Sequence, residues 1–362
     1  MRRQFAKYLL LKTRLPLISD HDLKSVLVNS SSFSEIKECV NLIEEFLNKR
    51  KVISKKLSRT YHTHRLYHPK AFKILVLGGN LKCGSCFSSV NELDIELNES
   101  VRVADMLQPR TMFYSVCVKG EIYVLGGFYL PDVRVRGIKW LKTVDKYSRY
   151  TDKWEVATEM CDDRGEFCAR GFANKIFVLG GGIARDMDEY HHVNSCLQYD
   201  TKSNEWSEIS KMNTTRCSAA STVFNGNVVV SGGIDVGDNL LKTVEAYDVG
   251  EDSWKYMAST KHVHFCHSLI SVSNKMYVMG NAFYEVYDKF SDKFVVLKSP
   301  YDFIPEYSQA ILIGSKILIF PCTHNECSFI AIYDVDKNKW SEKLIKTTKY
   351  LSYFCCVKLP WY

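Results

Sequence analysis

The sequence lacks long hydrophobic runs. No stretch approaches the roughly 18 uncharged apolar residues that a membrane-spanning helix requires, so no membrane partner is expected. Near the start, Lys12 and Arg14 interrupt a short apolar patch and no small-residue cleavage site follows, which argues against a signal peptide. The 13 cysteines are an odd number without the spacing of a disulfide framework. This pattern fits a reducing compartment, and we expect a cytoplasmic protein, with the cytoskeleton or nucleus as further locations.

Motifs of catalysis and of cofactor binding are also missing. The sequence contains no nucleophile elbow, no phosphate-binding loop and no His-Glu-x-x-His zinc helix. The aspartate box of sialidases does not occur, and no repeated set of Tyr and His residues suggests the copper site of an oxidase. We therefore predict a protein that is not an enzyme and that needs no cofactor.

Positive charge is concentrated near the start of the chain. Residues 1–70 hold 15 Lys and Arg against 6 Asp and Glu, whereas the remainder holds 33 against 35. The body of the protein thus has no overall field that would attract nucleic acid, and none is expected as a partner. The basic run Lys49–Arg59 can be a nuclear-localisation or nucleic-acid patch or a solvated linker after a helix, and the linker is favoured.

The chain divides into two parts by pattern. Ser32 followed by Glu35 is a helix-start signal, and the apolar residues after it recur at three- and four-residue steps. From Phe72 onward the pattern changes to short β-rich runs separated by glycine. We predict a short helical segment with a linker over residues 1–66 and a mainly β domain over residues 67–362.

Two markers recur in register through the β-rich part. The first is a glycine pair after an apolar run, found as Gly78-Gly79, Gly126-Gly127, Gly180-Gly181 and Gly232-Gly233 and in degenerate form as Gly280 and Phe320-Pro321. The second is a tyrosine with a tryptophan seven residues later, found as Tyr147/Trp154, Tyr199/Trp206, Tyr247/Trp254 and Tyr333/Trp340. All variation in length falls between the glycine pair and the tyrosine. Six units with a constant core and one variable loop predict a six-bladed β-propeller with strands a to d in each blade.

The number of strands predicts how the ring closes. No strand a precedes Gly78, whereas the extra strand Leu351–Leu359 follows the last unit. Pairing Leu351–Leu359 with Ile74–Leu77 would complete the first blade and remove an open sheet edge. Strand alternation then places the b–c and d–a connections on one face. We expect this loop face to capture a protein substrate, because variable loops on a rigid scaffold carry recognition.

The repeats resemble kelch repeats, which add Met-x3-Arg after the tryptophan. Met106/Arg110, Met160/Arg164 and Met212/Arg216 match this element. The N-terminal KYLLLKTRLPLIS, with the helix pair after it, resembles the end of the BACK domain of BTB–BACK–kelch proteins. The resemblance implies substrate recognition for a cullin-based ubiquitin ligase. This chain lacks the BTB domain, so cullin is an expected partner only if a BTB domain is supplied elsewhere. An actin-binding or cytoskeletal scaffold is the alternative.

Candidate contacts with a partner lie on the predicted loop face. They are Arg110, Arg164, Arg216 and His264 in d–a connections, and Arg134, Arg136 and Trp140 in the b–c loop of the second blade. Arginine and aromatic residues are enriched at binding hot spots. For the arginines of the d–a connections two roles stay open. They can hydrogen-bond carbonyls of a neighbouring b–c loop, or they can pair with an acidic peptide in bidentate fashion.

Cysteines in two b–c loops form a second candidate site. Cys83 and Cys86 lie in the loop of the first blade, and Cys322, His324 and Cys327 in that of the sixth. Ring closure makes these blades neighbours, and thiolates with an imidazole would suit zinc or an oxidation sensor. A single Cys-x-x-Cys is a weak signal, so unrelated loop cysteines are the favoured interpretation and no metal is predicted.

Overall fold

The computed structural model describes residues 73–79, 86–95, 99–129, 138–149, 151–186, 189–280, 283–298, 307–322, 329–344 and 354–359. The chain divides into two compact units, and every described residue belongs to the unit Lys73–Leu359. The predicted BACK-like segment, residues 1–66, lies outside the described ranges. Within those ranges, no helix is long and apolar enough to span a membrane.

Six four-stranded antiparallel sheets form the described fold, and we call them blades 1 to 6. From the inner to the outer strand, blade 1 consists of β29 (Cys355–Leu359), β1 (Lys73–Leu77), β2 (Val90–Asp94) and β3 (Glu99–Arg102). Blade 2 consists of β4 (Tyr114–Val118), β5 (Glu121–Leu125), β8 (Val144–Ser148) and β9 (Lys153–Ala157). Blade 3 consists of β11 (Cys168–Phe172), β12 (Lys175–Leu179), β15 (Cys196–Asp200) and β16 (Glu205–Ile209).

The remaining three blades repeat this order of strands. Blade 4 consists of β17 (Ala220–Phe224), β18 (Asn227–Ser231), β19 (Val244–Asp248) and β20 (Ser253–Tyr256). Blade 5 consists of β21 (Ser268–Val272), β22 (Lys275–Met279), β23 (Tyr284–Asp288) and β24 (Lys293–Leu297). Blade 6 consists of β25 (Tyr307–Ile313), β26 (Lys316–Cys322), β27 (Phe329–Asp334) and β28 (Lys339–Leu344).

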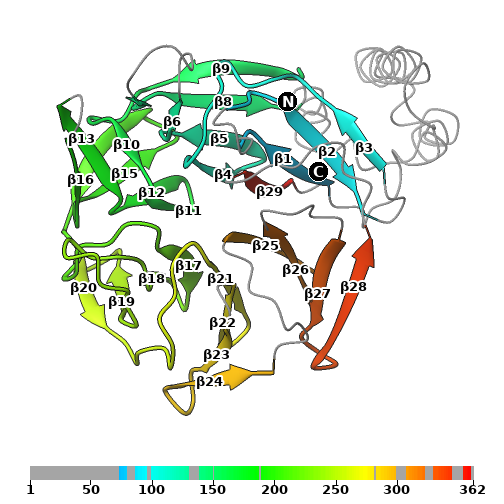
Figure 1. Cartoon of the computed structure of the whole chain (residues 1–362). Coiled ribbons are helices and arrows are strands. Elements are labelled where there is room, and N and C mark those ends of the chain that lie inside the picture. Colours follow the sequence, from blue (N-terminus) through cyan, green and yellow to red (C-terminus); the bar gives the residue numbers. More distant parts are fainter. Residues whose placement is uncertain are drawn as a thin grey trace, which may run out of the picture. The chain divides into compact units, whose positions relative to one another are not determined.

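The inner strands of successive blades contact one another around a ring. The contacts run from β29 to β4, β11, β17, β21 and β25, and β25 contacts β29 again. Figure 1 shows the six sheets arranged about this common centre. The arrangement is consistent with the predicted six-bladed propeller.

The C-terminal strand completes blade 1, as the strand count predicted. Strand β29 pairs with β1 in antiparallel register from Lys73 opposite Leu359 to Leu77 opposite Cys355. The first and last described strands thus belong to one sheet. The pairing satisfies the backbone of β1 on the side that would otherwise be an open sheet edge.

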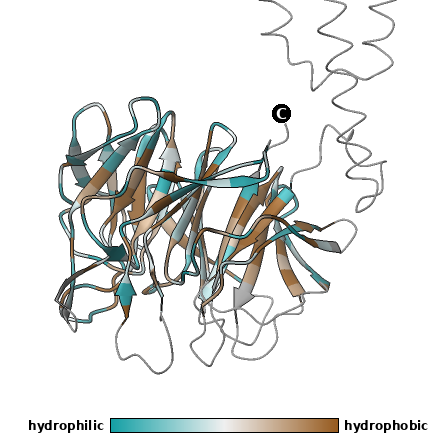
Figure 2. Ribbon diagram, turned by 90° about the horizontal axis from the view of Figure 1, so that it is seen from above, coloured by the Kyte–Doolittle hydropathy of each residue, from teal (hydrophilic) through white to brown (hydrophobic). Residues whose placement is uncertain are grey.

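Apolar side chains fill the spaces between neighbouring blades. Between blades 2 and 3, for example, Val116 and Leu125 pack with Ala169 and Val178 in one buried cluster. Figure 2 shows the hydrophobic residues along the strands and many hydrophilic ones at the turns. The hydrophobic core of the ring is therefore distributed over the interfaces between blades.

The recurrent tryptophans connect the outer strands of neighbouring blades. Each tryptophan indole donates a hydrogen bond to a carbonyl just after the outer strand of the preceding blade. The pairs are Trp154 Nε1 to Ala104 O at 2.9 Å, Trp206 to Thr158 at 2.9 Å, Trp254 to Ser210 at 2.8 Å and Trp340 to Lys298 at 3.0 Å. These bonds link each blade to the one before it, and they explain the constant spacing of this marker.

Candidate functional site

The b–c loops of blades 2 and 3 fold into small hairpins on one face. In blade 2, β6 (Phe128–Tyr129) pairs with β7 (Lys139–Trp140). In blade 3, β13 (Gly182–Asp186) pairs with β14 (Glu189–His192) and also with β10 (Arg164–Gly165), which belongs to the d–a connection. The d–a and b–c connections therefore lie together, as predicted, and we keep the name loop face for this side of the ring.

The candidate residues of the d–a connections are buried beneath the loop face. Arg110, Arg164, Arg216 and His264 each have a relative exposure of 0%. The three guanidinium groups donate to the carbonyl of the first glycine in the pair of their own blade: Arg110 to Gly126 at 3.1 Å, Arg164 to Gly180 at 3.0 Å and Arg216 to Gly232 at 2.7 Å. These bonds hold the start of each b–c loop against the blade.

The backbone of the same residues contacts the preceding blade. The N–H of Gly127 donates to the carbonyl of Arg164 at 2.8 Å, and the N–H of Gly181 donates to that of Arg216 at 2.9 Å. His264 accepts in the same way from Gly233 at 2.7 Å. Each connecting residue therefore joins two blades, by its carbonyl to one and by its side chain to the next.

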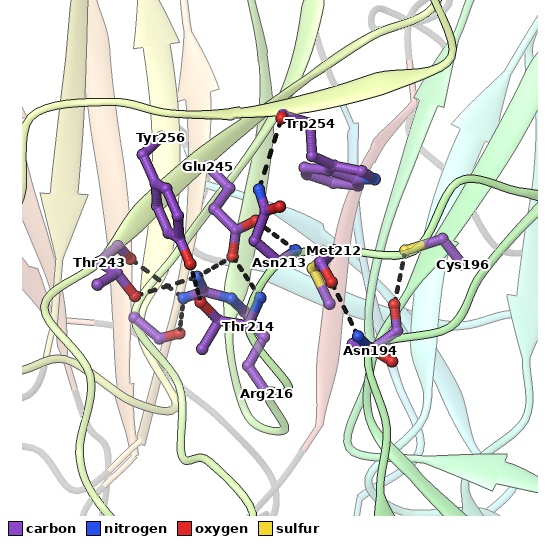
Figure 3. A network of polar contacts seen from close by, with 11 residues as sticks. Asn194, Cys196, Met212, Asn213, Thr214, Arg216, Thr243, Glu245, Trp254 and Tyr256 are labelled. Atoms are coloured by element: carbon purple, nitrogen blue, oxygen red, sulfur yellow. Dashed lines mark hydrogen bonds and ion pairs between the residues drawn. The ribbon is translucent and has the colours of Figure 1, made fainter.

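A carboxylate pairs with each of these three arginines. Arg216 Nη2 lies 2.5 Å from Glu245 Oε1, and Glu245 also accepts the backbone N–H groups of Asn213 and Thr214 at 2.7 and 3.1 Å (Figure 3). Arg110 Nη2 lies 2.5 Å from Asp145 Oδ2. Burial raises the pKa of Asp145, while the adjacent Arg110 opposes that change.

Blades 3 and 5 use variants of this arrangement. The acid stands two residues before the recurrent tyrosine in blades 2 and 4, but Leu197 occupies this place in blade 3. There Arg164 pairs instead with Asp162, at 2.8 Å. In blade 5, His264 Nε2 lies 3.0 Å from Glu285 Oε1.

This geometry matches the first of the two predicted roles, in which the arginines bond carbonyls beside a b–c loop. The loop belongs to the arginine's own blade, and a carboxylate completes the set. Pairing with an acidic peptide would require buried ion pairs to break and charged groups to leave their hydrogen bonds, which is costly. The side chains that a partner can reach on this face are therefore different ones.

Trp140 is the predicted contact that does lie at the surface of the loop face. Its half-buried ring stacks on Tyr190 of the blade 3 hairpin, with the ring centroids 5.4 Å apart and an interplanar angle of 27°. Phe128 lies 5.3 Å away on one side, and His192 lies 5.3 Å beyond Tyr190 on the other. We call these four residues the aromatic shelf. Arg134 and Arg136 lie outside the described residues.

Two paired glycines form the floor of the aromatic shelf. Gly165 of β10 pairs with Gly182 of β13. A Cβ atom would lie 2.7 Å from the Trp140 ring at Gly165, and 2.7 Å from the Tyr190 ring at Gly182. The rings can lie flat on this backbone only because both positions are glycine.

His192 continues the shelf toward blade 4. Its Nδ1 lies 2.8 Å from the carbonyl of Asp235, so this nitrogen carries the proton. Its Nε2 then accepts from the Cys217 thiol at 3.2 Å. The sequence contained signals for this site that were missed: the third glycine of Gly180–Gly182 and the tyrosine of the blade 3 loop.

The predicted thiol cluster is only partly within the described residues. Cys86 is half-buried and Cys322 ends β26, whereas Cys83, His324 and Cys327 lie outside the described ranges. Among the residues that the structure describes, no group of three or more His, Cys, Asp or Glu side chains could hold a metal ion. The proposed cluster stays a prediction.

Comparison with known proteins identifies the repeats. The family model KLHDC2/KLHL20/DRC7 Kelch-repeats domain matches residues 62–281. Kelch-like protein 41a of Danio rerio is 28% identical over 185 residues, which are 51% of this chain and 25% of that protein. Spermatocyte protein spe-26 of Caenorhabditis elegans is 25% identical over 291 residues, 74% of this chain and 49% of the relative.

A viral protein is similar over a comparable range. Kelch repeat protein C2 of Camelpox virus is 22% identical over 268 residues, 67% of this chain and 50% of the relative. The chain thus spans between a quarter and a half of the length of these relatives. The family model covers more than half of the chain, and the chain belongs to the kelch-repeat family, whose domains bind other proteins.

Proposed function

We propose that this chain captures a partner protein on its loop face and has no catalytic activity of its own. The supporting observation is the placement of exposed apolar side chains in the b–c loops of three successive blades. They are Ile138 at 47% exposure, Tyr190 at 47%, Val236 at 75% and Leu240 at 43%. Apolar groups that gather on one rigid face lose contact with water when a partner covers them, which favours association.

We further propose that the captured protein is a substrate of a cullin-based ubiquitin ligase. The kelch-like relatives and the resemblance of residues 1–66 to a BACK domain support this role. In this proposal a BTB domain supplied elsewhere provides the contact with cullin. A cytoplasmic location, expected from the cysteine pattern, belongs to the same proposal.

Partner capture by matched variants tests the use of the loop face. The variant Tyr190→Ala/Leu240→Ala removes two exposed groups of the loop face, and Phe290→Ala removes one in the turn between β23 and β24, at the opposite ends of the strands. Tagged wild type and Phe290→Ala should retain the same partner, and the double variant should lose it. Equal capture by all three would contradict binding on the loop face.

The fate of the captured partner tests the ligase role. Depletion of this chain in cells should lower ubiquitylation of the partner and raise its abundance if the chain recruits a substrate. A partner of unchanged abundance, together with co-sedimentation of the chain with filamentous actin, would contradict the ligase role and support the scaffold.

A further inference from the structure

The buried ion pairs change the charge that the loop face offers to a partner. Arg110, Arg164 and Arg216 each pair with an acid at 2.5 to 2.8 Å, so these three cations contribute little net field outside the ring. Binding of an acidic peptide by these three arginines would need their guanidinium groups free, and each is already paired with an acid of the ring. The other charged side chains near the aromatic shelf therefore decide whether it attracts a positive or a negative group of the partner.

Two carboxylates near the aromatic shelf have no cationic partner among the described residues. Glu166 follows the floor residue Gly165, and its Oε2 accepts the hydroxyl of Ser218, at 3.3 Å. Asp238 lies exposed in the b–c loop of blade 4. Burial, followed by the negative charge of Glu166, the nearby Cys217 and the negative charge of Asp238, raises the pKa of the Tyr190 hydroxyl. The backbone places Asp238 beside the shelf as well: its N–H donates to the carbonyl of Asp235 at 3.2 Å, and the same carbonyl accepts from His192 of the shelf at 2.8 Å.

Three lysines of the adjoining loops have other partners. Lys139 lies over the ring of Tyr129, with Nζ 5.9 Å from the centroid. Lys142 pairs with Glu159 at 3.4 Å, and Lys242 donates to the carbonyl of Lys261 at 2.9 Å. None of these bonds reaches Glu166 or Asp238.

An aromatic stack beside carboxylates that pair with no cation among the described residues suits a planar cation. The face of a tyrosine or tryptophan ring attracts a cation electrostatically, and guanidinium also stacks on aromatic faces. A carboxylate at the edge of such a stack can accept two parallel N–H groups of guanidinium. Lysine offers a compact charge that neither stacks nor bonds in this bidentate way.

We propose that the aromatic shelf binds an arginine side chain of the partner protein, which stacks on Tyr190 and pairs with Glu166 and Asp238. This inference rests on the proposed function, because it assigns a chemistry to the loop face that captures the partner. It assigns the partner segment a positive charge, opposite to that of the acidic peptide considered as one of two roles for the arginines.

Random peptides displayed on phage and selected against the full chain test this inference. The selected peptides should share an arginine beside apolar residues. For a synthetic peptide with the selected sequence, replacement of the arginine by lysine should weaken binding severalfold, and replacement by glutamate should abolish it. Glu166→Gln/Asp238→Asn should weaken the arginine peptide at least tenfold and abolish the discrimination between arginine and lysine.

Matched variants separate binding from folding. Glu251→Gln removes an exposed carboxylate in the turn between β19 and β20, at the opposite ends of the strands, and should leave peptide affinity unchanged. Tyr190→Phe keeps the aromatic face and should bind nearly as wild type does, whereas Tyr190→Ala should not bind. Circular dichroism confirms that each variant is folded.

The other possible outcomes distinguish failure of the arginine inference from failure of the proposed function. Selected peptides that are acidic or neutral, yet are lost with Tyr190→Ala, would overturn the arginine inference and leave the proposed function intact. Affinity that is unchanged in Glu166→Gln/Asp238→Asn would overturn it as well. Peptides that bind independently of every loop-face variant, or no selected peptide at all, would count against both.

Discussion

Arg216 Nη2 lies 2.5 Å from Glu245 Oε1, and both side chains have an exposure of 0%. The pair lies where a b–c loop, a d–a connection and the outer part of blade 4 meet. Because no water can replace a lost partner there, each charge depends on the other. The pair thus holds the loop face in place without being part of the surface that a partner contacts.

Removal of one charge from this pair should destabilise the fold strongly. Arg216→Met leaves Glu245 buried with backbone donors alone, and we expect the free energy of unfolding to fall by about 3–5 kcal/mol. Urea denaturation followed by circular dichroism measures this change. As a control, Lys255→Met breaks an exposed pair with Glu251 and should have no measurable effect. Equal effects of the two changes would contradict the structural role of Arg216.

The first glycine of each pair should be irreplaceable for a steric reason. Gly232 has a φ of +60°, and an added Cβ would lie 2.3 Å from the carbonyl oxygen of His264. Gly314 has a φ of +58°, but nothing lies within 4 Å of its added Cβ. Since both share the backbone strain, Gly232→Ala should cost about 1–3 kcal/mol more than Gly314→Ala in urea denaturation. Similar losses would contradict the close approach of the two blades.

The ring should depend on its last strand. A chain that ends at residue 350 lacks β29, so β1 has an unpaired edge and the inner ring is interrupted. We expect this truncated chain to lose cooperative unfolding and to be cleaved rapidly by protease. Addition of the peptide Leu351–Leu359 under reducing conditions should restore protection, whereas a scrambled peptide should not. Full protection of the truncated chain without peptide would contradict closure by β29.

His267 should make the fold sensitive to mild acid. Burial, together with nearby His264 and Arg216, lowers the pKa of His267 well below 6.5. The folded state therefore keeps the imidazole neutral while the unfolded chain takes up a proton as pH falls below 6.5. Stability is fully present above this value and should fall by up to about 1.4 kcal/mol per pH unit below it. Urea denaturation between pH 7 and pH 5 measures the slope.

Matched variants assign this slope to His267. In His267→Gln the loss of stability between pH 7 and pH 5 should be smaller than in wild type. The exposed Lys255→Met should keep the wild-type slope, because the pKa of Lys255 is raised above its usual value and lies outside this range. Glu285 does not interfere in this range. Although burial acts the other way, hydrogen bonds from His264 and two backbone N–H groups lower the pKa of Glu285 below 4.5. An unchanged slope in His267→Gln would contradict the assignment.

The blades were predictable because their markers act locally or between adjacent blades. Gly126 must lie against the Arg164 carbonyl, and Trp154 must reach Ala104, so spacing along the chain records spacing between blades. The closing strand followed from counting strands. Sequence thus determined the order and pairing of the strands without knowledge of any side-chain contact.

The role of the arginines was only half predictable. An acid two residues before the tyrosine accompanies Arg110 and Arg216 in the sequence, and this recurrence is a signal for a buried pair. Blade 3 departs from the rule, since Arg164 uses the nearby Asp162. Whether a charge points inward or toward solvent depends on the path of the d–a connection, which the sequence pattern does not specify.

The aromatic shelf was not predictable as a unit. Trp140 and Tyr190 belong to variable loops of different blades, and no repeat aligns them. Their stacking depends on the pairing of Gly165 with Gly182, which join a d–a connection to a b–c loop. Such a site becomes visible only when the hairpins are placed side by side.

Site-specific photo-crosslinking tests the central claim, capture of a partner on the loop face. Benzoylphenylalanine is placed at Val236, which is 75% exposed on this face, and in a separate chain at Phe290, which is 82% exposed in the turn between β23 and β24. After irradiation in cell extract, we predict a crosslinked partner from position 236 and none from position 290. Crosslinking from position 290 alone, or equal crosslinking from both positions, would contradict the claim.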